Sequence, residues 1–524
     1  MIGYTTFSFF LLYFGITFVV YSLLPQKVRW VALLLGSVTF YTISAKGHVF
    51  MLIAVNLIVW LVGLWLQKLS DTQSAKRKAA PKEEKKAIKA KYNGYKRIVL
   101  ALGAVSVVGI LLTGKYTNFF IETFNAVFSQ HASMLNIIQP LGLSFFTLQA
   151  ISYIADIYYG RVQAEKNPLR ITLFLSFMLT VVEGPIARYG QLGAQLNTCK
   201  INRLEDVSRG FLRVLWGLFK KVFIADRAVL LVTAVFDNYE SFSGFGVVAG
   251  IVFYTIQLYC EFSGIMDVMC GLGQMMGIEM PENFKRPFFA KSINEFWQRW
   301  HITLGAWLRD YIFYGVSFSK GIKNLSSKTR KKFSPYYSNL IPTTVALFFV
   351  WFANGFWHGS GWKYIVYGLY YYVLMTIGLF LEPLFAKLSK ALRIDRESKG
   401  FGVFRVIRTI VIVNFGMLIF RADDLGVALK MFTSIFSNLN PLTLFLGVYD
   451  FNTGAGDILL VFIGLAAMVV VGVISEKGIN ITERIYKLPY VAKLGIYLAF
   501  LFVIIIFGAY GAGYGVVDLI YANF

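Results

Sequence analysis

Charged residues are scarce in this 524-residue chain: Asp, Glu, Lys and Arg make up only 15% of it, against roughly a quarter in a typical soluble protein. Hydrophobic residues make up 57%, and the mean hydropathy is +0.60. So few polar side chains cannot cover a water-facing surface, which excludes a soluble globular protein. Repeated apolar runs of about 20 residues instead predict an all-α polytopic membrane protein.

Cysteine is also rare. Cys199, Cys260 and Cys270 are too few and too poorly spaced for a disulfide framework or a zinc site, so we expect no bound metal. The chain also lacks a Gly-x-Ser-x-Gly elbow and a phosphate-binding glycine loop, which disfavours a covalent serine or cysteine intermediate. We expect no bound cofactor. The first apolar run lacks a basic start and a small-residue cleavage site, which predicts a retained transmembrane helix rather than a signal peptide.

Acidic residues are outnumbered by basic ones, 28 against 51, giving a net charge of +23. The basic residues lie mostly in short loops between apolar runs, a pattern typical of cytoplasmic loops and of attraction to anionic lipids, so we do not expect nucleic-acid binding. Residues 68–97 and 320–338 are the two basic segments predicted to face the cytoplasm. Three crossings before the first segment predict an extracytoplasmic N-terminus in a multi-pass protein of the plasma membrane.

The apolar runs predict roughly 11 to 13 spanning segments within a single membrane domain over residues 1–524. The apolar runs themselves are more numerous than the predicted spans. They lie at about 4–24, 28–45, 48–67, 98–113, 116–130, 137–159, 169–188, 210–236, 246–277, 340–357, 362–386, 403–420, 427–447, 456–475 and 491–520. Residues 281–316 are too polar for a lipid-facing helix and predict short re-entrant helices inside the protein. The high aromatic content, 17%, suits the lining of a central tunnel.

Only four histidines occur, and two of them, His301 and His358, directly follow a tryptophan. An imidazole titrates near neutral pH, so these residues are candidates for proton transfer at opposite ends of one path through the membrane. If residues 294–311 form one helix, Trp297, Trp300 and His301 share a face, with Arg309 about two turns away. Such a face suits a narrow path for a phosphate-bearing or thioester-bearing donor, and we expect Trp297, Trp300, Arg309 and Trp357 to shape that path. The alternative is an amphipathic helix at the membrane surface in which His301 is simply hydrogen-bonded.

His358 follows Trp357 and precedes Gly359-Ser-Gly361, whose small residues allow another segment to approach closely. A neutral imidazole here could take the proton of an acceptor hydroxyl and return one to a thiolate leaving group. Asn354 lies one turn earlier on the same helical face, where it could orient the ring or contact an oxyanion. The alternative is a helix-capping histidine at the membrane interface.

Glu261 and Asp267 interrupt a long apolar run. Intramembrane carboxylates need partners and are candidates for a substrate path or donor site, although pairing between helices is the more common role. The residues by themselves leave two classes open: an enzyme, or a proton-coupled transporter in which the histidines and Asp267 relay protons.

Six segments in order resemble motifs of the membrane-bound O-acyltransferase (MBOAT) family, in the bacterial branch that holds alginate O-acetyltransferases and teichoic acid D-alanyl transfer proteins. The segments are Pro140–Asp156, Gly184–Arg188, Glu261–Asp267, Pro281–Phe284, Asn294–Tyr311 and Gly355–Gly359. The chain is more similar to the O-acetyltransferases in length and in its opening segments.

The resemblance implies a helical bundle with a cytoplasmic donor entrance and an outward-facing acceptor funnel. It implies that His358 is catalytic and that His301 supports transfer from the donor side. We therefore expect an acyltransferase that passes an acetyl group from acetyl-CoA to a cell-surface polysaccharide or to an extracytoplasmic acetyltransferase partner. The alternative within this chemistry is D-alanyl transfer to teichoic acid from an acidic carrier protein with a phosphopantetheine arm.

Overall fold

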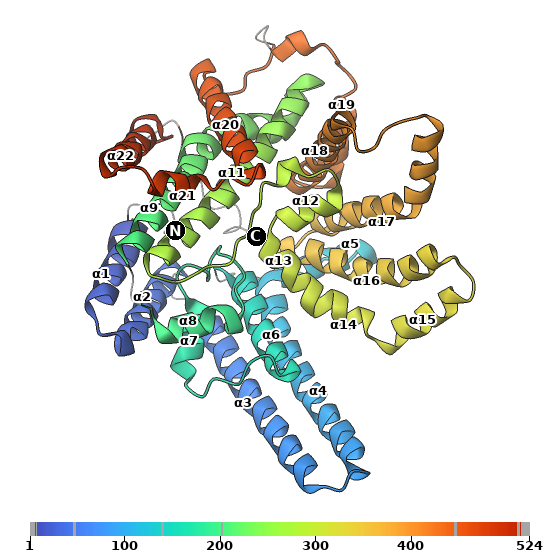
Figure 1. Cartoon of the computed structure of the whole chain (residues 1–524). Helices are drawn as coiled ribbons and strands as arrows, with labels where there is room; N and C mark the ends of the chain where they lie inside the picture. The colour runs from blue at the N-terminus through green and yellow to red at the C-terminus, as the bar shows by residue number, and fades with distance from the viewer. Residues whose placement is uncertain are drawn as a thin grey trace. The chain divides into compact units, whose positions relative to one another are not determined.

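The structure is a computed structural model that describes residues 6, 8–45, 49–137, 141–200, 203–444, 448–510 and 514. Within these ranges the chain is helical and contains no strand, as the sequence predicts (Figure 1). Three predicted features lie outside the described residues. They are the turn at 46–47, Pro140 and most of the part of the predicted run 491–520 that follows residue 510. The helices form two compact units, one mainly of residues 1–214 and one mainly of residues 215–520.

The first unit opens with short helices and is continued by a long antiparallel pair, α3 and α4, which lie side by side in Figure 1. Helix α6 packs against both members of this pair. The elements are η1 (Phe9–Gly15), α1 (Ile16–Leu23), η2 (Gln26–Val28), α2 (Arg29–Ser44), α3 (Phe50–Ala79), α4 (Glu84–Leu111), η3 (Leu112–Tyr116), α5 (Thr117–Phe128), α6 (Leu143–Tyr159), α7 (Pro168–Ser176), η4 (Tyr189–Gly193), α8 (Ala194–Thr198) and most of α9 (Leu204–Leu218), where η marks a 3₁₀ or π helix.

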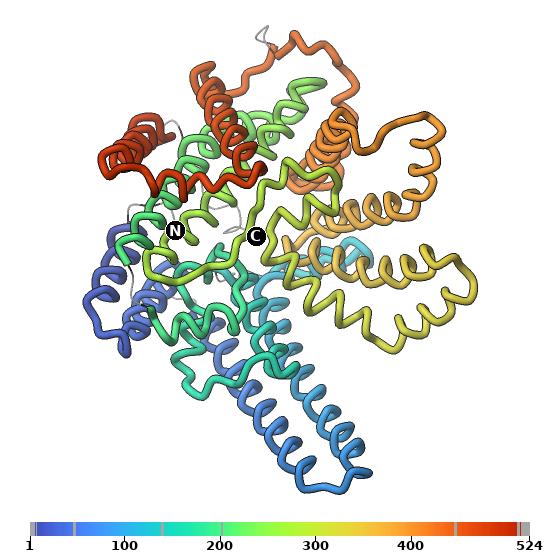
Figure 2. Tube along the Cα trace, viewed as in Figure 1, coloured from blue at the N-terminus to red at the C-terminus, as the bar shows by residue number. Residues whose placement is uncertain are grey.

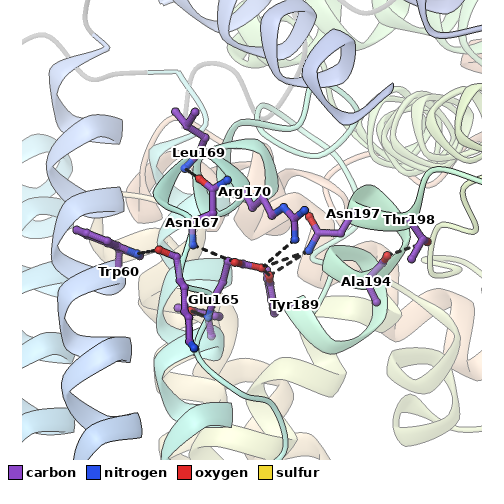
Figure 3. Close-up of polar contacts among 11 residues, drawn as sticks. Trp60, Glu165, Asn167, Leu169, Arg170, Tyr189, Ala194, Asn197 and Thr198 are labelled. Atoms are coloured by element: carbon purple, nitrogen blue, oxygen red, sulfur yellow. Dashed lines mark hydrogen bonds and ion pairs between the residues drawn. The ribbon is translucent and has the colours of Figure 1, made fainter. Parts of the chain in front are cut away.

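Glu165 holds the loop before α7 together in this unit (Figure 3). Its carboxylate accepts hydrogen bonds from the Tyr189 hydroxyl at 3.0 Å and from the backbone N–H of Asn167 at 3.0 Å. The Asn167 side chain in turn caps α7 by accepting from the backbone N–H of Leu169. One carboxylate therefore fixes both the entry to α7 and its contact with η4.

The second unit holds every histidine and tryptophan that the sequence places in the candidate site. Helices α16 and α17 form its central antiparallel pair, visible in the tube of Figure 2. The elements are η5 (Phe219–Ala225), α10 (Asp226–Asp237), η6 (Tyr239–Ser241), most of α11 (Phe245–Met275), η7 (Pro287–Phe289), α12 (Ile293–Arg299), α13 (Ile302–Trp307), η8 (Leu308–Phe313), α14 (Tyr314–Ser317), α15 (Lys320–Arg330), α16 (Pro335–His358), α17 (Trp362–Ala391), α18 (Lys399–Arg421), α19 (Leu425–Ser434), η9 (Pro441–Leu444), α20 (Ala455–Glu476), α21 (Ile481–Tyr486) and α22 (Tyr490–Phe507).

Among the described residues, eight helices are long and apolar enough to cross a membrane, and two shorter apolar helices add to them. The number is below the predicted 11 to 13 because some predicted runs are not helical throughout or are too polar. The run at 169–188 is helical only as far as Ser176. The run at 210–236 stays helical through the π helix η5, but five charged residues make it too polar to count as a span: Arg213, Lys220, Lys221, Asp226 and Arg227. The runs at 98–113 and 116–130 instead join into one continuous helical stretch, Glu84–Phe128.

The polar segments fold as follows. Residues 68–97 form the ends of α3 and α4 and the turn between them, and residues 320–338 form α15 and the first turn of α16. Residues 281–316 consist of short helices, as predicted. The single domain over residues 1–524 and the central tunnel stay predictions.

Candidate active site

The stretch around His301 is two short helices rather than the single helix that the sequence spacing predicts. Helix α12 ends at Arg299, Trp300 is extended, and His301 has a φ of 45°, in the left-handed region. The backbone of residues 283–285 causes the break, because the N–H of Lys285 donates to Arg299 O and the N–H of Ile302 donates to Asn283 O. The predicted common face of Trp297, Trp300 and His301 therefore does not exist as a helix face.

Asn283 fixes the orientation of the buried His301 ring. Its Oδ1 accepts from the backbone N–H of Thr303 at 3.1 Å and from the Thr303 hydroxyl at 2.9 Å. A backbone N–H can only donate, so the Asn283 atom must be the oxygen. His301 Nδ1 lies 3.1 Å from the same oxygen and must carry the hydrogen, which makes Nε2 the basic nitrogen of the neutral ring.

Burial lowers the pKa of His301 from its ordinary value of 6.5 to about 3. The side chain is only 3% exposed, and the edge of the Phe262 ring faces it with centroids 4.8 Å apart. A charged imidazolium would lose its hydration in these surroundings, so the ring stays neutral throughout the physiological pH range.

This shift in the pKa of His301 predicts that the folded protein becomes less stable as the pH is lowered. Below pH 6.5 the unfolded chain takes up a proton at His301, whereas the folded chain does not until about pH 3, so the free energy of unfolding decreases as the pH falls through this window. At pH 4.5 the loss is about 3 kcal/mol relative to pH 7.5, from roughly 1.4 kcal/mol per pH unit. Chemical unfolding in detergent should show this additional pH dependence for the wild type and not for His301→Gln. Parallel pH profiles for the two proteins would contradict it.

His358 is the last residue of α16 and is also 3% exposed. Its ring is surrounded by aromatic edges: the centroids of Phe420 and Tyr367 lie 5.3 Å and 5.7 Å away. The Trp357 ring contacts both histidine rings, with centroids 5.1 Å from His358 and 5.8 Å from His301. The two imidazoles therefore lie within about 11 Å of each other, much less than the membrane thickness of about 30 Å that we expected between them.

Gly355 allows α17 to reach this site. A Cβ atom at this position would lie 2.3 Å from the Tyr364 carbonyl oxygen, so a side chain cannot be accommodated without moving the backbone of α17. A Cβ atom at Gly368, on the α17 side of this contact, would likewise lie 2.3 Å from the Trp351 carbonyl oxygen. The glycine at the start of the Gly355–Gly359 motif therefore serves close helix packing beside His358.

A methyl group at Gly355 is expected to destabilise the protein by about 1–3 kcal/mol through overpacking. Gly378, in the membrane-spanning part of α17, is the matched control, because nothing lies within 4 Å of a Cβ built there. Thermal unfolding of the Gly355→Ala and Gly378→Ala variants in detergent measures the difference. Equal melting temperatures would show that the α16–α17 contact tolerates a side chain.

Asn354 and Trp297 bring polar atoms into the same aromatic surroundings. Asn354 is 5% exposed, and within the described ranges its Oδ1 has no hydrogen-bond partner. The same holds for Trp297 Nε1, whose ring packs edge-on against Tyr371 and Trp351 at 4.8 Å and 5.1 Å. Trp300 instead packs into an aromatic cluster, stacked on Phe296 with centroids 5.4 Å apart. The substrate-path role expected of Asn354 and Trp297 stays a prediction.

Glu261 and Asp267 lie in ion pairs with two consecutive lysines of η5. Lys221 Nζ lies 3.2 Å from Glu261 Oε1 and 2.6 Å from Asp226 Oδ1, while Lys220 Nζ lies 2.6 Å from Asp267 Oδ2. Glu261 is fully buried and Lys221 is 1% exposed, so this is a buried charge cluster. The sequence allowed two roles for Glu261 and Asp267, pairing between helices and a place in the substrate path. This charge cluster corresponds to the first of them.

Arg309 does not join the buried residues. Its side chain is 59% exposed and pairs with the neighbouring Asp310 at 3.0 Å. The break at Trp300–His301 alters the helical register that put it near His301 in the sequence prediction. A donor-binding role for Arg309 stays a prediction.

Sequence reasoning missed three residues that organise this region: Asn283, Lys220 and Lys221. The two lysines had a readable signal, since adjacent cations inside an apolar run require acidic partners. Asn283 gave no comparable signal, because its contact with His301 depends on how the loop before η7 packs.

Comparisons with known proteins identify the family of this chain. A model of the membrane-bound O-acyltransferase family (MBOAT) matches residues 164–330. A probable alginate O-acetylase, AlgI, of Azotobacter vinelandii is 31% identical over 422 residues, which cover 80% of this chain and 74% of the relative. A peptidoglycan O-acetyltransferase of Helicobacter pylori is 31% identical over 365 residues, 65% of this chain and 64% of the relative. A teichoic acid D-alanyltransferase of Bacillus subtilis is 29% identical over 290 residues, 54% and 69% of the two chains.

The apolar helices and these relatives define a multi-pass membrane acyltransferase. The chain belongs to the membrane-bound O-acyltransferase family.

Proposed function

We propose that this enzyme transfers an acetyl group from a cytoplasmic thioester, acetyl-CoA, to a hydroxyl of an exported cell-surface polysaccharide, directly or through an extracytoplasmic partner. The buried imidazole of His358, in contact with Trp357, carries the proposal, because an imidazole can accept the proton of an attacking hydroxyl and return it to the leaving group. The most similar of the relatives described above is named as an alginate O-acetylase, which supports acetyl as the transferred group.

In the proposed reaction, His358 accepts the proton of the acceptor hydroxyl as its oxygen attacks the carbonyl carbon of the thioester. The new C–O ester bond forms, the C–S bond breaks, and the proton passes from the imidazolium to the departing thiolate. Asn354 Oδ1 is placed one helical turn from His358 to accept a hydrogen bond from the ring N–H or from the attacking hydroxyl. His301, kept neutral by burial and oriented by Asn283, supports the donor side.

Labelled donors test this proposal. Membrane vesicles containing the enzyme are supplied with radiolabelled acetyl-CoA, and base-labile label in the glycan fraction is counted against vesicles containing His358→Ala. Enzyme-dependent ester label supports acetyl transfer. Label from a D-alanyl carrier protein alone favours the second candidate, which the Bacillus subtilis relative supports. No enzyme-dependent label from either donor would overturn the proposal.

The topology is part of the proposal. We infer that the enzyme lies in the plasma membrane with its N-terminus outside and with residues 68–97 and 320–338 in the cytoplasm, because these segments are strongly basic. Single cysteines placed in either segment should react with a membrane-impermeant maleimide only after the cells are opened.

A further inference from the structure

A cavity of about 270 Å³ lies in the second unit between three membrane-spanning helices and the loop at η7. Apolar side chains form most of its wall, with Thr255, Asn414 and Arg286 as polar members. The lining residues on the helices are Val252, Thr255, Ile256 and Tyr259 of α11, Ile410 and Asn414 of α18, and Leu465, Met468, Val469 and Gly472 of α20. The loop contributes Arg286, Phe288 and Phe289.

The cavity opens where these helices face the hydrocarbon. Val469 is 55% exposed and Val252 is 39% exposed, although both belong to helices that are apolar enough to span a membrane. Within the cavity the polar groups are already satisfied, since the Thr255 hydroxyl donates to Asn414 Oδ1 at 2.8 Å and the Asn414 amide donates to Ile410 O at 2.9 Å. An occupant of the cavity must therefore be apolar.

One end of the cavity is charged. Helix α20 is apolar from Ile458 to Ile474. Its Glu476, one turn beyond Gly472, pairs with Arg286, which lines the cavity. Around this pair the loop and α18 form a continuous polar network, because Arg299 also pairs with Glu476 and both Arg405 and Arg408 donate to Lys291 O. The guanidinium groups of Arg286, Arg299, Arg405 and Arg408 outnumber the carboxylates of Glu295 and Glu476 in this network, which Lys291 joins through its backbone N–H and C=O.

We propose that this cavity binds one hydrocarbon chain of an anionic phospholipid, with the phosphate at the basic network around Arg286. The apolar wall within the spanning part of the helices and the excess of cations at their ends match the polarity of such a lipid. The volume lies just below the roughly 300–1,000 Å³ of most small-ligand sites, which suits a single chain rather than a whole lipid. This lipid site does not depend on which acyl group the enzyme transfers.

The inner wall of the cavity connects this lipid to the candidate active site. Tyr259 and Phe288 line the cavity and contact Trp300 at 5.9 Å and 6.3 Å, directly beside His301 in the chain. Phe284 contacts both Trp300 and Phe262, and Phe262 faces the His301 ring. A bound chain would therefore support the aromatic cluster that holds His301 in place.

Two valines of α20 give a matched test. Val469 lines the cavity and Val470 does not, yet they are 55% and 57% exposed and differ by one position. Native mass spectrometry of detergent-solubilised protein, titrated with phosphatidylglycerol, should show one tightly bound lipid for the wild type and for Val470→Trp. Val469→Trp fills the opening and should bind this lipid at least about tenfold more weakly, because the chain loses its apolar contacts.

Equal phosphatidylglycerol binding by the two tryptophan variants would overturn the site. Binding of phosphatidylcholine or oleate at the Val469-sensitive site as tightly as phosphatidylglycerol would overturn the assignment to an anionic phospholipid. Should Val469→Trp fail to fold, wild-type protein is photolysed with phosphatidylglycerol that carries a diazirine on its chain. Cross-links on residues 465–472 and 252–259 support the proposal, and their absence there contradicts it.

Discussion

Replacing His358 with alanine is expected to lower ester-linked acyl groups on the cell-surface glycan by about 10²–10⁴-fold, the range for loss of a general base. His358 is the buried imidazole at the end of α16, one helical turn from the Asn354 side chain. Mass spectrometry of the glycan, at matched protein levels in the membrane, measures the effect. The missing mass also distinguishes an acetyl from an alanyl ester.

The control for this experiment is His131→Ala, because His131 is an exposed histidine outside the helices. It should leave the ester content unchanged. If His358→Ala accumulates as folded protein and the glycan keeps its esters, His358 is not the base and another group near Trp357 must be sought.

Replacing Lys221 with methionine is expected to destabilise the protein by about 3–5 kcal/mol, because it leaves the fully buried Glu261 and the neighbouring Asp226 without their shared cation. Glu261→Gln should cost much less, since Lys221 keeps its 2.6 Å contact with Asp226. The double variant Lys221→Met/Glu261→Gln should regain part of the loss, because the buried anion is gone. Thermal unfolding in detergent and the yield of monodisperse protein report these differences.

The same variants separate the two roles that the sequence left open for Glu261. If the role of Glu261 is purely structural, the folded Glu261→Gln variant should retain most of its acyl-transfer activity. Loss of transfer by at least about tenfold in a stably folded Glu261→Gln would instead assign Glu261 to the substrate path. Lys220→Met is the control for the neighbouring pair, because its partner Asp267 is 19% exposed and can be partly hydrated.

Local sequence pattern picks out the two candidate histidines but does not predict the shape of their surroundings. The placement of His358 at a helix end before small residues could be predicted, since Gly359-Ser-Gly361 breaks the apolar run after it. The single helix over 294–311 was wrong because a helical periodicity says nothing of competing partners. Backbone hydrogen bonds from a segment 14 to 19 residues earlier, at Asn283 and Lys285, end α12 and turn His301 into the left-handed region.

The sequence by itself determined that this chain is a helical membrane protein with two unusual Trp-His pairs. The bilayer requires long apolar segments, and such segments can be recognised in the amino-acid sequence without knowledge of any tertiary contact. Only the packing of the folded chain brings Trp357 against His301, lets Asn283 set the tautomer of His301 and pairs Lys221 with Glu261. These contacts join residues far apart in the chain, so side-chain packing and the cost of burying an unpaired polar group select them.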